Sequence, residues 1–187
     1  MIVVMLNGSI TLCVPNLLGG GRGGATPEAL AARTAAISKL HDAFVSDLLT
    51  GIIPLVESRY RLLAIAGVSM GGAETLCSAP SNLDKFAWIG VFSMGSEEGV
   101  NGGVDSDFIE RNTAFFADPE KTNKQVRLVW IGGGKDDHRV GDGPRRLSET
   151  LKAHNPRHEY HETEGGHSWI NWRLYLRDFS NCCSRRR

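Results

Sequence analysis

The sequence predicts an α/β fold, with a mostly parallel sheet and helices on both of its faces. Short apolar runs rich in β-branched residues alternate with longer stretches whose apolar residues recur at helical spacing. Glycine or polar residues follow the apolar runs, as expected where buried parallel strands end in turns. Because no linker or internal repeat breaks this alternation, residues 1–187 are expected to form a single domain.

Five runs are expected to form the strands of this sheet. The first three are almost wholly apolar, which favours burial on both faces of the sheet. The last alternates in polarity, which favours one solvent-facing side. In chain order, the expected strands are residues 2–6, 63–68, 86–93, 126–131 and 158–163.

Helices are expected between these strands. The segment Thr26-Pro27-Glu28 is typical of a helix start, because proline fits the first helical turn. Pro54 should bend or end the helix that contains it, since proline lacks the N–H that an interior position needs. The glycine-rich stretch 7–27 predicts a surface loop without the spacing of a phosphate-binding motif. The expected helices are residues 27–40, 41–56, 71–78, 107–117, 143–154 and 172–179.

Composition and charge limit the kinds of molecule that the protein is expected to bind. The 187 residues are 41% hydrophobic and 22% charged, as in an ordinary soluble globular protein. Basic and acidic residues number 21 each, which argues against binding to nucleic acid or to an anionic membrane. The apolar run 1–6 is too short for a signal peptide, and no run is long enough to span a bilayer. A soluble protein is therefore expected, in either a secreted or a cytoplasmic location.

One serine stands in the sequence pattern of a nucleophile. Residues 67–71 have the form Gly-x-Ser-x-Gly, between an apolar strand and a helix-forming stretch. Small flanking residues let the strand and helix backbones pass close to a serine in a strained turn. Ser69 is therefore the candidate nucleophile. The N–H of Met70, at the start of the helix, is the candidate oxyanion donor.

The two partners that a serine nucleophile needs follow two later strands. An imidazole must take the hydroxyl proton, and a carboxylate must orient that imidazole. His167 lies in a glycine-flanked loop after strand 158–163, and Asp136 and Asp137 follow strand 126–131. Because the carboxyl ends of parallel strands meet at one edge of a sheet, these groups are expected to meet there. The residues alone leave both carboxylates open, with Asp137 preferred.

Other titratable groups are assigned no chemical role. A metal site at Asp136, Asp137 and His138 would lack a spaced ligand set, so no metal and no cofactor are expected. The four cysteines match no zinc or redox pattern, and Cys13 and Cys77 are interpreted as small core or loop residues. The remaining histidines are expected to be surface or hydrogen-bonded residues: His41, His138, His154, His158 and His161.

Three motifs together resemble a known family. They are Gly67–Gly72, Gly134–Asp137, and Gly165–Trp169 with Trp172 after it. The chain is similar to esterases of the esterase D type, which include feruloyl and acetyl xylan esterases of the first carbohydrate esterase family. Enterochelin esterases and S-formylglutathione hydrolase are relatives of that family. The resemblance covers nearly the whole chain. It implies an α/β-hydrolase fold with Ser69 as nucleophile, Asp137 as acid and His167 as base.

The chain differs from that family at its beginning. Residues 5–8 resemble a family segment that follows a strand ending in a His-Gly turn, whose N–H forms half of the oxyanion hole. The expectation is therefore an α/β-hydrolase fold that is shortened at its N-terminus. Strand 63–68 then pairs with strand 2–6 or keeps an open edge, through which the chain could self-associate into a homo-oligomer. A further hypothesis is that a glycine-rich segment near residues 7–24 supplies a substitute N–H.

The expected function is a serine carboxylesterase that forms an acyl-enzyme. The resemblance suggests feruloyl or acetyl esters of plant polysaccharide, as small molecules or linked to the polymer, with Trp169 at the substrate. Trp172 is expected to pack in the core. One alternative is an acyltransferase or thioesterase with the same triad, and another is a hydrolase-fold binding module with impaired catalysis. Because loss of one oxyanion donor lowers turnover by about 10²–10³-fold, a shortened chain is still expected to be a weak esterase.

Overall fold

The computed structural model describes residues 26–58, 63–95, 108–110 and 112–184. They contain a fully parallel four-stranded sheet whose strands lie side by side in chain order. The strands are β1 (Leu63–Val68), β2 (Phe86–Phe92), β3 (Leu128–Gly134) and β4 (His158–Thr163). This arrangement confirms the predicted α/β fold with a parallel sheet. The expected strand 2–6 and the glycine-rich loop lie outside the described residues.

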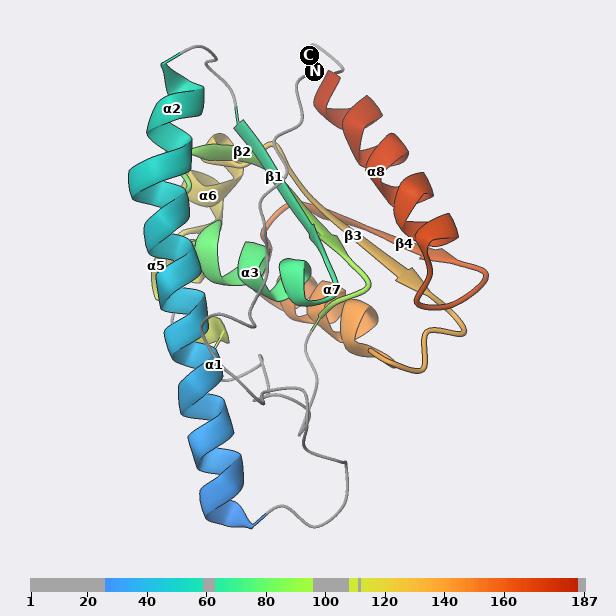
Figure 1. Ribbon diagram of the computed structural model, residues 1–187. Helices are drawn as coiled ribbons and strands as arrows, with labels where there is room; N and C mark the ends of the chain where they lie inside the picture. Colours follow the sequence, from blue (N-terminus) through green and yellow to red (C-terminus); the bar gives the residue numbers. More distant parts are fainter. Residues whose placement is uncertain (1–25, 59–62, 96–107, 111, 185–187) are drawn as a thin grey trace.

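Helices cover both faces of the sheet (Figure 1). On one face lie α3 (Met70–Ser78) and α7 (Gly143–His154), and on the other lies α8 (Trp169–Ser184). A long helix runs beside α3 and consists of α1 (Pro27–Asp47), a π-helical turn (Leu48–Ile52) and α2 (Ile53–Glu57). Two short helices, α5 (Thr113–Ala117) and α6 (Pro119–Gln125), precede β3. None of the helices in these described ranges is long and apolar enough to cross a membrane.

The central strands contribute side chains to two separate apolar clusters, one on each face of the sheet. Successive side chains of a strand point to opposite faces, so every second residue of β2 and β3 meets the same helices. The cluster under α3 and α7 contains Ile89, Val91, Val129, Ile131, Leu147 and Leu151. The cluster under α8 contains Trp88, Phe92, Leu128, Trp130, Tyr175 and Phe179. Burial on both faces explains why these two strands are continuous apolar runs in the sequence.

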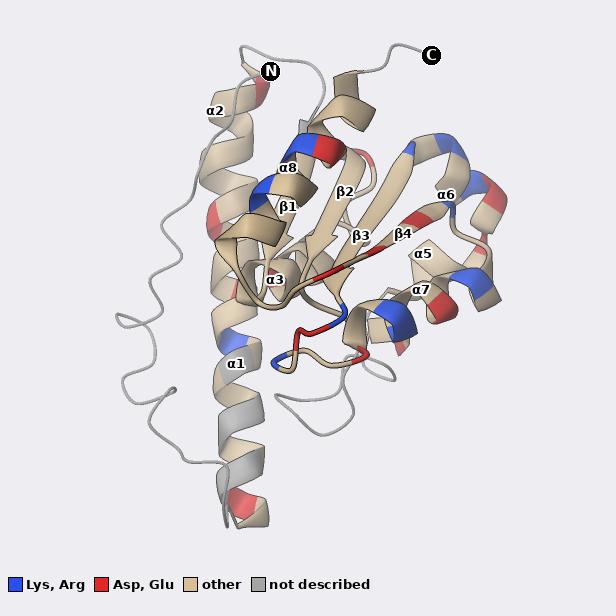
Figure 2. Ribbon diagram, turned by 90° about the vertical axis from the view of Figure 1, so that its right-hand side faces the viewer, with Lys and Arg blue, Asp and Glu red and all other residues tan. Residues whose placement is uncertain are grey.

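The charged residues lie mainly away from the sheet. Figure 2 shows Lys, Arg, Asp and Glu along α8, α6 and α7 and in the loop between β3 and α7, and within the sheet it shows acidic residues on β4. Both signs are interspersed there, which agrees with the zero net charge of the sequence. The helices therefore present the ordinary division of an apolar inner face and a polar outer face.

Several elements differ from the sequence-based expectations, among them α8, which spans Trp169–Ser184 where a helix over residues 172–179 was expected. The expected helices 27–40 and 41–56 are joined without a break, and a π-helical turn interrupts the α-helix just before Pro54, which lies in the first turn of α2. Strand β3 extends to Gly134, since its three glycines pair with β4. Helix α6 was not predicted. Asp118 caps it by accepting a hydrogen bond from the Lys121 N–H at 3.0 Å, but its polar sequence has no apolar periodicity.

Glu74 is a buried carboxyl group in the contact between α1 and α3. The residue is 7% exposed, and burial raises its pKa from 4.5 to about 7. Between these two pH values the folded protein binds more protons at Glu74 than the unfolded chain does. The free energy of unfolding contributed by Glu74 is therefore fully present below pH 4.5 and is lost as the pH rises to about 7.

Replacing Glu74 with glutamine should stabilise the protein above neutral pH. The amide keeps the shape of the protonated carboxyl but cannot ionise, so we expect the free energy of unfolding at pH 8 to rise by about 1–3 kcal/mol. At pH 4.5 the two proteins should differ little. Urea titrations of both proteins at the two pH values measure the effect. Equal stabilities at pH 8 would contradict the assignment of a raised pKa to Glu74.

Candidate active site

Ser69 occupies a strained turn between β1 and α3. Its backbone angles, φ 53° and ψ −120°, lie outside the regions that L residues favour. The Ser69 N–H donates to the carbonyl of Phe92 at 2.8 Å, which ties the turn to the end of β2. Helix α3 starts at the next residue, so its N-terminal N–H groups lie beside the serine. This is the geometry expected of Gly-x-Ser-x-Gly at a strand-to-helix turn.

The two glycines of that pattern are required to different degrees. A Cβ on Gly67 would lie 1.8 Å from the carbonyl oxygen of Gly71, whereas a Cβ on Gly71 would meet nothing within 4 Å among the described residues. Gly72 also lacks space, since its Cβ would lie 2.6 Å from the Cβ of Met94. Close approach of a neighbouring backbone therefore requires glycine at 67, and close approach of the Met94 side chain requires it at 72. The space around Gly71, in contrast, does not require a small residue.

A matched pair of substitutions tests this difference. Gly67→Ala should lower the free energy of unfolding by about 3 kcal/mol or more, because the clash is with backbone atoms that cannot move aside. Gly71→Ala should change it by less than about 1 kcal/mol, with a gain expected from the higher helix propensity of alanine. Denaturant titration followed by circular dichroism measures both. Equal losses in the two variants would contradict the proposed close approach at Gly67.

The structure brings Ser69, His167 and Asp137 into one hydrogen-bonded chain. Ser69 Oγ lies 3.0 Å from His167 Nε2, and His167 Nδ1 lies 2.9 Å from Asp137 Oδ2 and 3.1 Å from Oδ1. With Nδ1–H donating to the carboxylate, Nε2 is the acceptor for the serine hydroxyl. The side chain of Asp137 is fully buried and that of His167 is 14% exposed. Three loops that follow β1, β3 and β4 thus meet at one edge of the sheet.

Asp136 and Asp137 are placed differently although they are adjacent. Asp136 is exposed, and its carboxylate accepts a hydrogen bond from the Gly165 N–H at 3.3 Å. Asp137 points inward to His167, and the Arg139 N–H donates to its Oδ1 at 3.2 Å. Asp136 therefore holds the loop that carries His167, whereas Asp137 contacts the ring itself.

Two loops pack tightly against each other to make this contact. We call residues 135–142, between β3 and α7, the acid loop, and residues 164–168, between β4 and α8, the histidine loop. A Cβ on Gly134 would lie 2.2 Å from the Gly165 carbonyl oxygen, and one on Gly166 would lie 2.8 Å from that of Asp136. The Asp136 N–H also donates to the Gly165 carbonyl at 3.1 Å. The glycines let the backbones approach closely enough for Asp137 to reach His167.

Three residues support the site, and two of them, Ser93 and Asn171, were not identified from the sequence as parts of it. Trp172 packs edge-on against the His167 ring, with centroids 5.0 Å apart, and its indole N–H donates to Ser93 Oγ at 3.1 Å. Ser93 is fully buried and has φ 47°. Asn171 is buried and donates to the carbonyls of Glu164 and Gly166, both at 3.1 Å. Only the buried contacts reveal these supports, because serine and asparagine are common in loops and helix caps.

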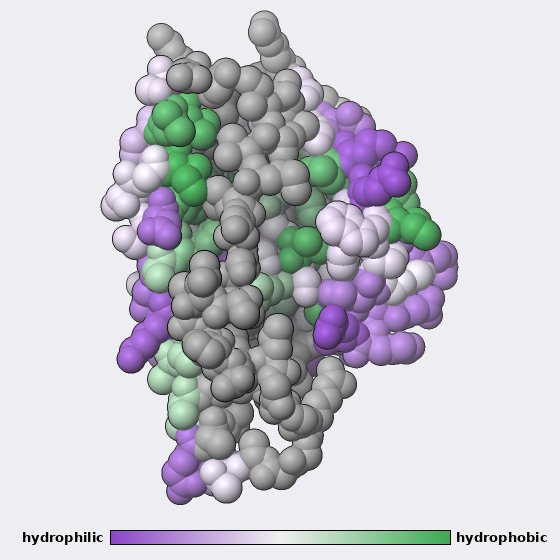
Figure 3. All heavy atoms as spheres, in the orientation of Figure 1, coloured by the Kyte–Doolittle hydropathy of each residue, from purple (hydrophilic) through white to green (hydrophobic). Residues whose placement is uncertain are grey.

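Three large apolar side chains beside the site are exposed to solvent. Trp169, at the start of α8, is 69% exposed, the adjacent Ile170 is 76% exposed and Met70 is 39% exposed. Trp169 also packs against Trp172 with centroids 5.2 Å apart. Figure 3 shows hydrophobic side chains on the surface near the start of α8, as well as over α2. Trp172, in contrast, is half-buried against the cluster under α8, as expected for a packing residue.

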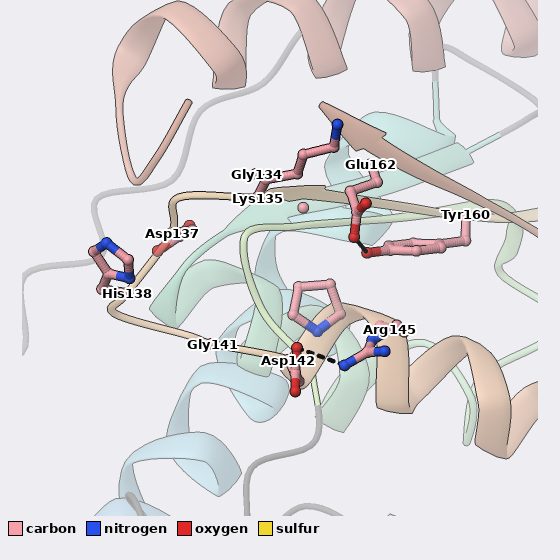
Figure 4. A pocket seen from close by; sticks show the side chains of 11 residues that line it. Gly134, Lys135, Asp137, His138, Gly141, Asp142, Arg145, Tyr160 and Glu162 are labelled. Atoms are coloured by element: carbon pink, nitrogen blue, oxygen red, sulfur yellow. Dashed lines mark hydrogen bonds and ion pairs between the residues drawn. The ribbon is translucent and has the colours of Figure 1, made fainter. Parts of the chain in front are cut away.

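A cavity of about 290 Å³ lies beside the acid loop. Asp137 and His138 line it from that loop, Arg145 from α7, and Tyr160 and Glu162 from β4 (Figure 4). The Tyr160 hydroxyl donates to Glu162 at 3.0 Å. Of the three hydrogen-bonded residues, Asp137 lines this cavity and Ser69 does not. In the described part of the chain, no group of three His, Cys, Asp or Glu side chains is placed to hold a metal ion.

Solved structures of several esterases share this fold. A CE1 ferulic acid esterase from Anaeromyces mucronatus, in complex with ferulic acid, is 22% identical with a TM-score of 0.57, over 87% of this chain and 61% of that chain. The same enzyme without substrate is 21% identical with a TM-score of 0.55, over 85% of this chain and 57% of that one. S-formylglutathione hydrolase from Staphylococcus aureus is 20% identical with a TM-score of 0.54, over 80% of this chain and 64% of that one.

The solved structures establish the fold, and a family model establishes the family. The chain spans less than two thirds of the length of each of these solved proteins, and the superpositions show that its fold is that of the α/β-hydrolases. A model of the esterase family, described as "Putative esterase", matches residues 19–180, which include the candidate site. This match, over most of the chain, agrees with the resemblance seen in the three motifs. The chain therefore belongs to this esterase family.

Proposed function

We propose that the protein is a serine carboxylesterase in which Ser69, His167 and Asp137 act as a catalytic triad. The observation that carries the proposal is the continuous run of hydrogen bonds from the Ser69 hydroxyl, through the His167 ring, to the Asp137 carboxylate. Burial of Asp137 and the strained turn at Ser69 support it, because both are features of activated nucleophiles. Membership of the esterase family supports the same class of reaction.

In the proposed reaction, Ser69 Oγ attacks the ester carbonyl carbon while His167 Nε2 takes the hydroxyl proton. Asp137 keeps the proton on Nδ1 and stabilises the imidazolium that forms. The ester C–O bond then breaks, the proton passes from Nε2 to the departing alcohol, and the acyl group remains on Ser69. A water molecule, deprotonated by the same imidazole, hydrolyses the acyl-enzyme and restores the serine.

The N–H of Met70 is the proposed donor to the oxyanion. Met70 is the first residue of α3, where N–H groups have no acceptor within the helix and the helix dipole favours negative charge. A second donor, expected from a preceding turn or from the glycine-rich segment near residues 7–24, would come from outside the described residues.

Feruloyl or acetyl esters of plant polysaccharide are the proposed substrates. The feruloyl esters are supported by the activity named for structures of the same fold, which are ferulic acid esterases. The acetyl esters are supported by the resemblance of the three sequence motifs alone. The exposed Trp169 ring packs against Trp172, and the Trp172 ring packs against His167. One side chain therefore separates Trp169 from the proposed base. Its flat apolar face suits either an aromatic acyl group or a sugar ring. We therefore propose that Trp169 contacts the substrate.

Covalent labelling and hydrolysis by the same protein test the proposed function. The chain should react with a fluorophosphonate probe, and peptide mapping should find the adduct on Ser69. It should also hydrolyse p-nitrophenyl acetate and methyl ferulate. A folded protein that is neither labelled nor active would refute the esterase and favour a binding module with this fold. Product that appears only when an alcohol or thiol acceptor is added would favour acyl transfer over hydrolysis.

A further inference from the structure

A second cluster of nucleophilic and titratable side chains lies between α1 and α3, apart from the candidate active site. The ring of His41, on α1, lies between two residues of α3. Its Nδ1 is 3.1 Å from Cys77 Sγ, and its Nε2 is 3.5 Å from Glu74 Oε1. Glu74 and Cys77 are three residues apart on α3, so both side chains lie on one face of that helix. Helix α1, which carries His41, runs beside α3 (Figure 1).

The cluster repeats the order of groups found at the proposed triad. A nucleophilic atom contacts one ring nitrogen of a histidine, and a carboxylate faces the other. The side chains of Glu74 and His41 are 9% and 14% exposed, so the carboxylate is more than nine-tenths buried. Glu74 Oε2 has no hydrogen-bond partner among the described residues, which leaves the imidazole as its compensating group. Burial raises the pKa of Glu74 to about 7, so above this pH the ionised carboxylate favours a cationic His41.

A cationic imidazole beside a thiol stabilises the thiolate, which is the reactive form of cysteine. Cys77 is only half-buried, so a small reagent could reach it. We propose that Cys77, His41 and Glu74 form a second reactive centre, in which Cys77 reacts as a thiolate with peroxides and other small soft electrophiles. This centre does not depend on the proposed esterase function, because it shares no residue with Ser69, His167 or Asp137.

The reaction with hydrogen peroxide balances within the cluster. Cys77 S⁻ attacks one oxygen of the peroxide, an S–O bond forms and the O–O bond breaks. The sulfur is oxidised by two electrons to the sulfenic acid, and the peroxide is reduced. The departing hydroxide takes the proton of the His41 imidazolium and leaves as water. Glu74 positions the imidazole and stabilises its charge before the step.

The same chain contains a natural comparison. Cys182 and Cys183, near the end of α8, are also half-buried. Burial raises the pKa of the Cys183 thiol to about 11, with a smaller effect from Cys182, so this thiol should react slowly at neutral pH. Trypsin releases Cys77 in a peptide with no other cysteine, and Cys182 and Cys183 together in another. Mass spectrometry can therefore compare the two sites within one sample.

Timed alkylation of the native protein tests the proposal. With limiting iodoacetamide at pH 8, where Glu74 is ionised, Cys77 should be modified at least about tenfold faster than Cys182 and Cys183, and peroxide with dimedone should trap a sulfenic acid at Cys77. His41→Gln and Glu74→Gln should each slow the modification of Cys77 by about tenfold, while the Cys182–Cys183 peptide reacts as before. Circular dichroism confirms that each variant is folded.

The outcomes separate a reactive centre from a structural hydrogen bond. Equal rates at Cys77 and at the Cys182–Cys183 peptide in the native protein would overturn the proposal without any variant. An unchanged rate at Cys77 in folded Glu74→Gln would also overturn it, even where His41→Gln fails to fold. Hydrolysis of p-nitrophenyl acetate should be retained in Cys77→Ser, which distinguishes failure of this proposal from failure of the esterase proposal.

Discussion

Replacing Ser69 with alanine should lower kcat/KM for p-nitrophenyl acetate by about 10⁴–10⁶-fold. The alanine methyl group cannot attack the ester, so only binding and the oxyanion donor would remain to accelerate the reaction. The loss should appear with every ester that the wild-type protein hydrolyses, because the acyl-enzyme forms on Ser69 Oγ in each case. Initial rates for the two proteins, with fluorophosphonate labelling as a second readout, measure the effect.

A second serine–histidine pair in the chain provides a matched control. Ser148 Oγ lies 3.0 Å from His158 Nε2, but His158 Nδ1 contacts the carbonyl of Pro156 at 3.0 Å instead of a carboxylate. Ser148 lies within α7, not in a strained turn at the start of a helix. Ser148→Ala should therefore keep kcat/KM within about threefold of the wild type. Full activity in Ser69→Ala would show that another residue is the nucleophile.

Asp137→Asn should lower kcat by about 10⁴-fold, whereas Asp136→Asn should lower it by less than about tenfold. In Asp137→Asn, the new side-chain amide would offer an N–H toward His167 Nδ1 and so favour the ring tautomer in which Nε2 carries the proton. That tautomer cannot accept the proton of Ser69. Asp136 contacts only the backbone of the histidine loop, and its carboxylate can be replaced there by the amide oxygen of asparagine.

The two variants change adjacent residues, and each replaces a carboxylate with an amide, so they alter the net charge equally. Thermal unfolding of both proteins shows whether an activity loss reflects the site or the fold, which matters because Asp137 is buried. Rates for p-nitrophenyl acetate between pH 6 and 9 then compare the two at several protonation states. Equal losses in the two variants, or a larger loss in Asp136→Asn, would contradict the assignment of Asp137 as the triad acid.

Much of the fold could be predicted from local sequence alone. The helix 143–154 and the strands 63–68 and 158–163 have the predicted bounds, because their periodicity and punctuation are local signals. For the extent of β3, in contrast, a distant partner decided the outcome. Strand β3 continues through three glycines, which are weak strand formers, because β4 pairs with their backbone.

The candidate site, like the fold, could be predicted from the sequence only in part. The sequence alone determined that Ser69 stands at a strand-to-helix turn and that a histidine and two adjacent aspartates follow later strands, because motif and chain order are local properties. Only the tertiary structure decided that Asp137 and not Asp136 contacts His167, and that Trp172, Ser93 and Asn171 hold that histidine in place. The direction of a side chain in a loop depends on the loop packed against it, and the close approach of two glycine-containing backbones fixes that direction here.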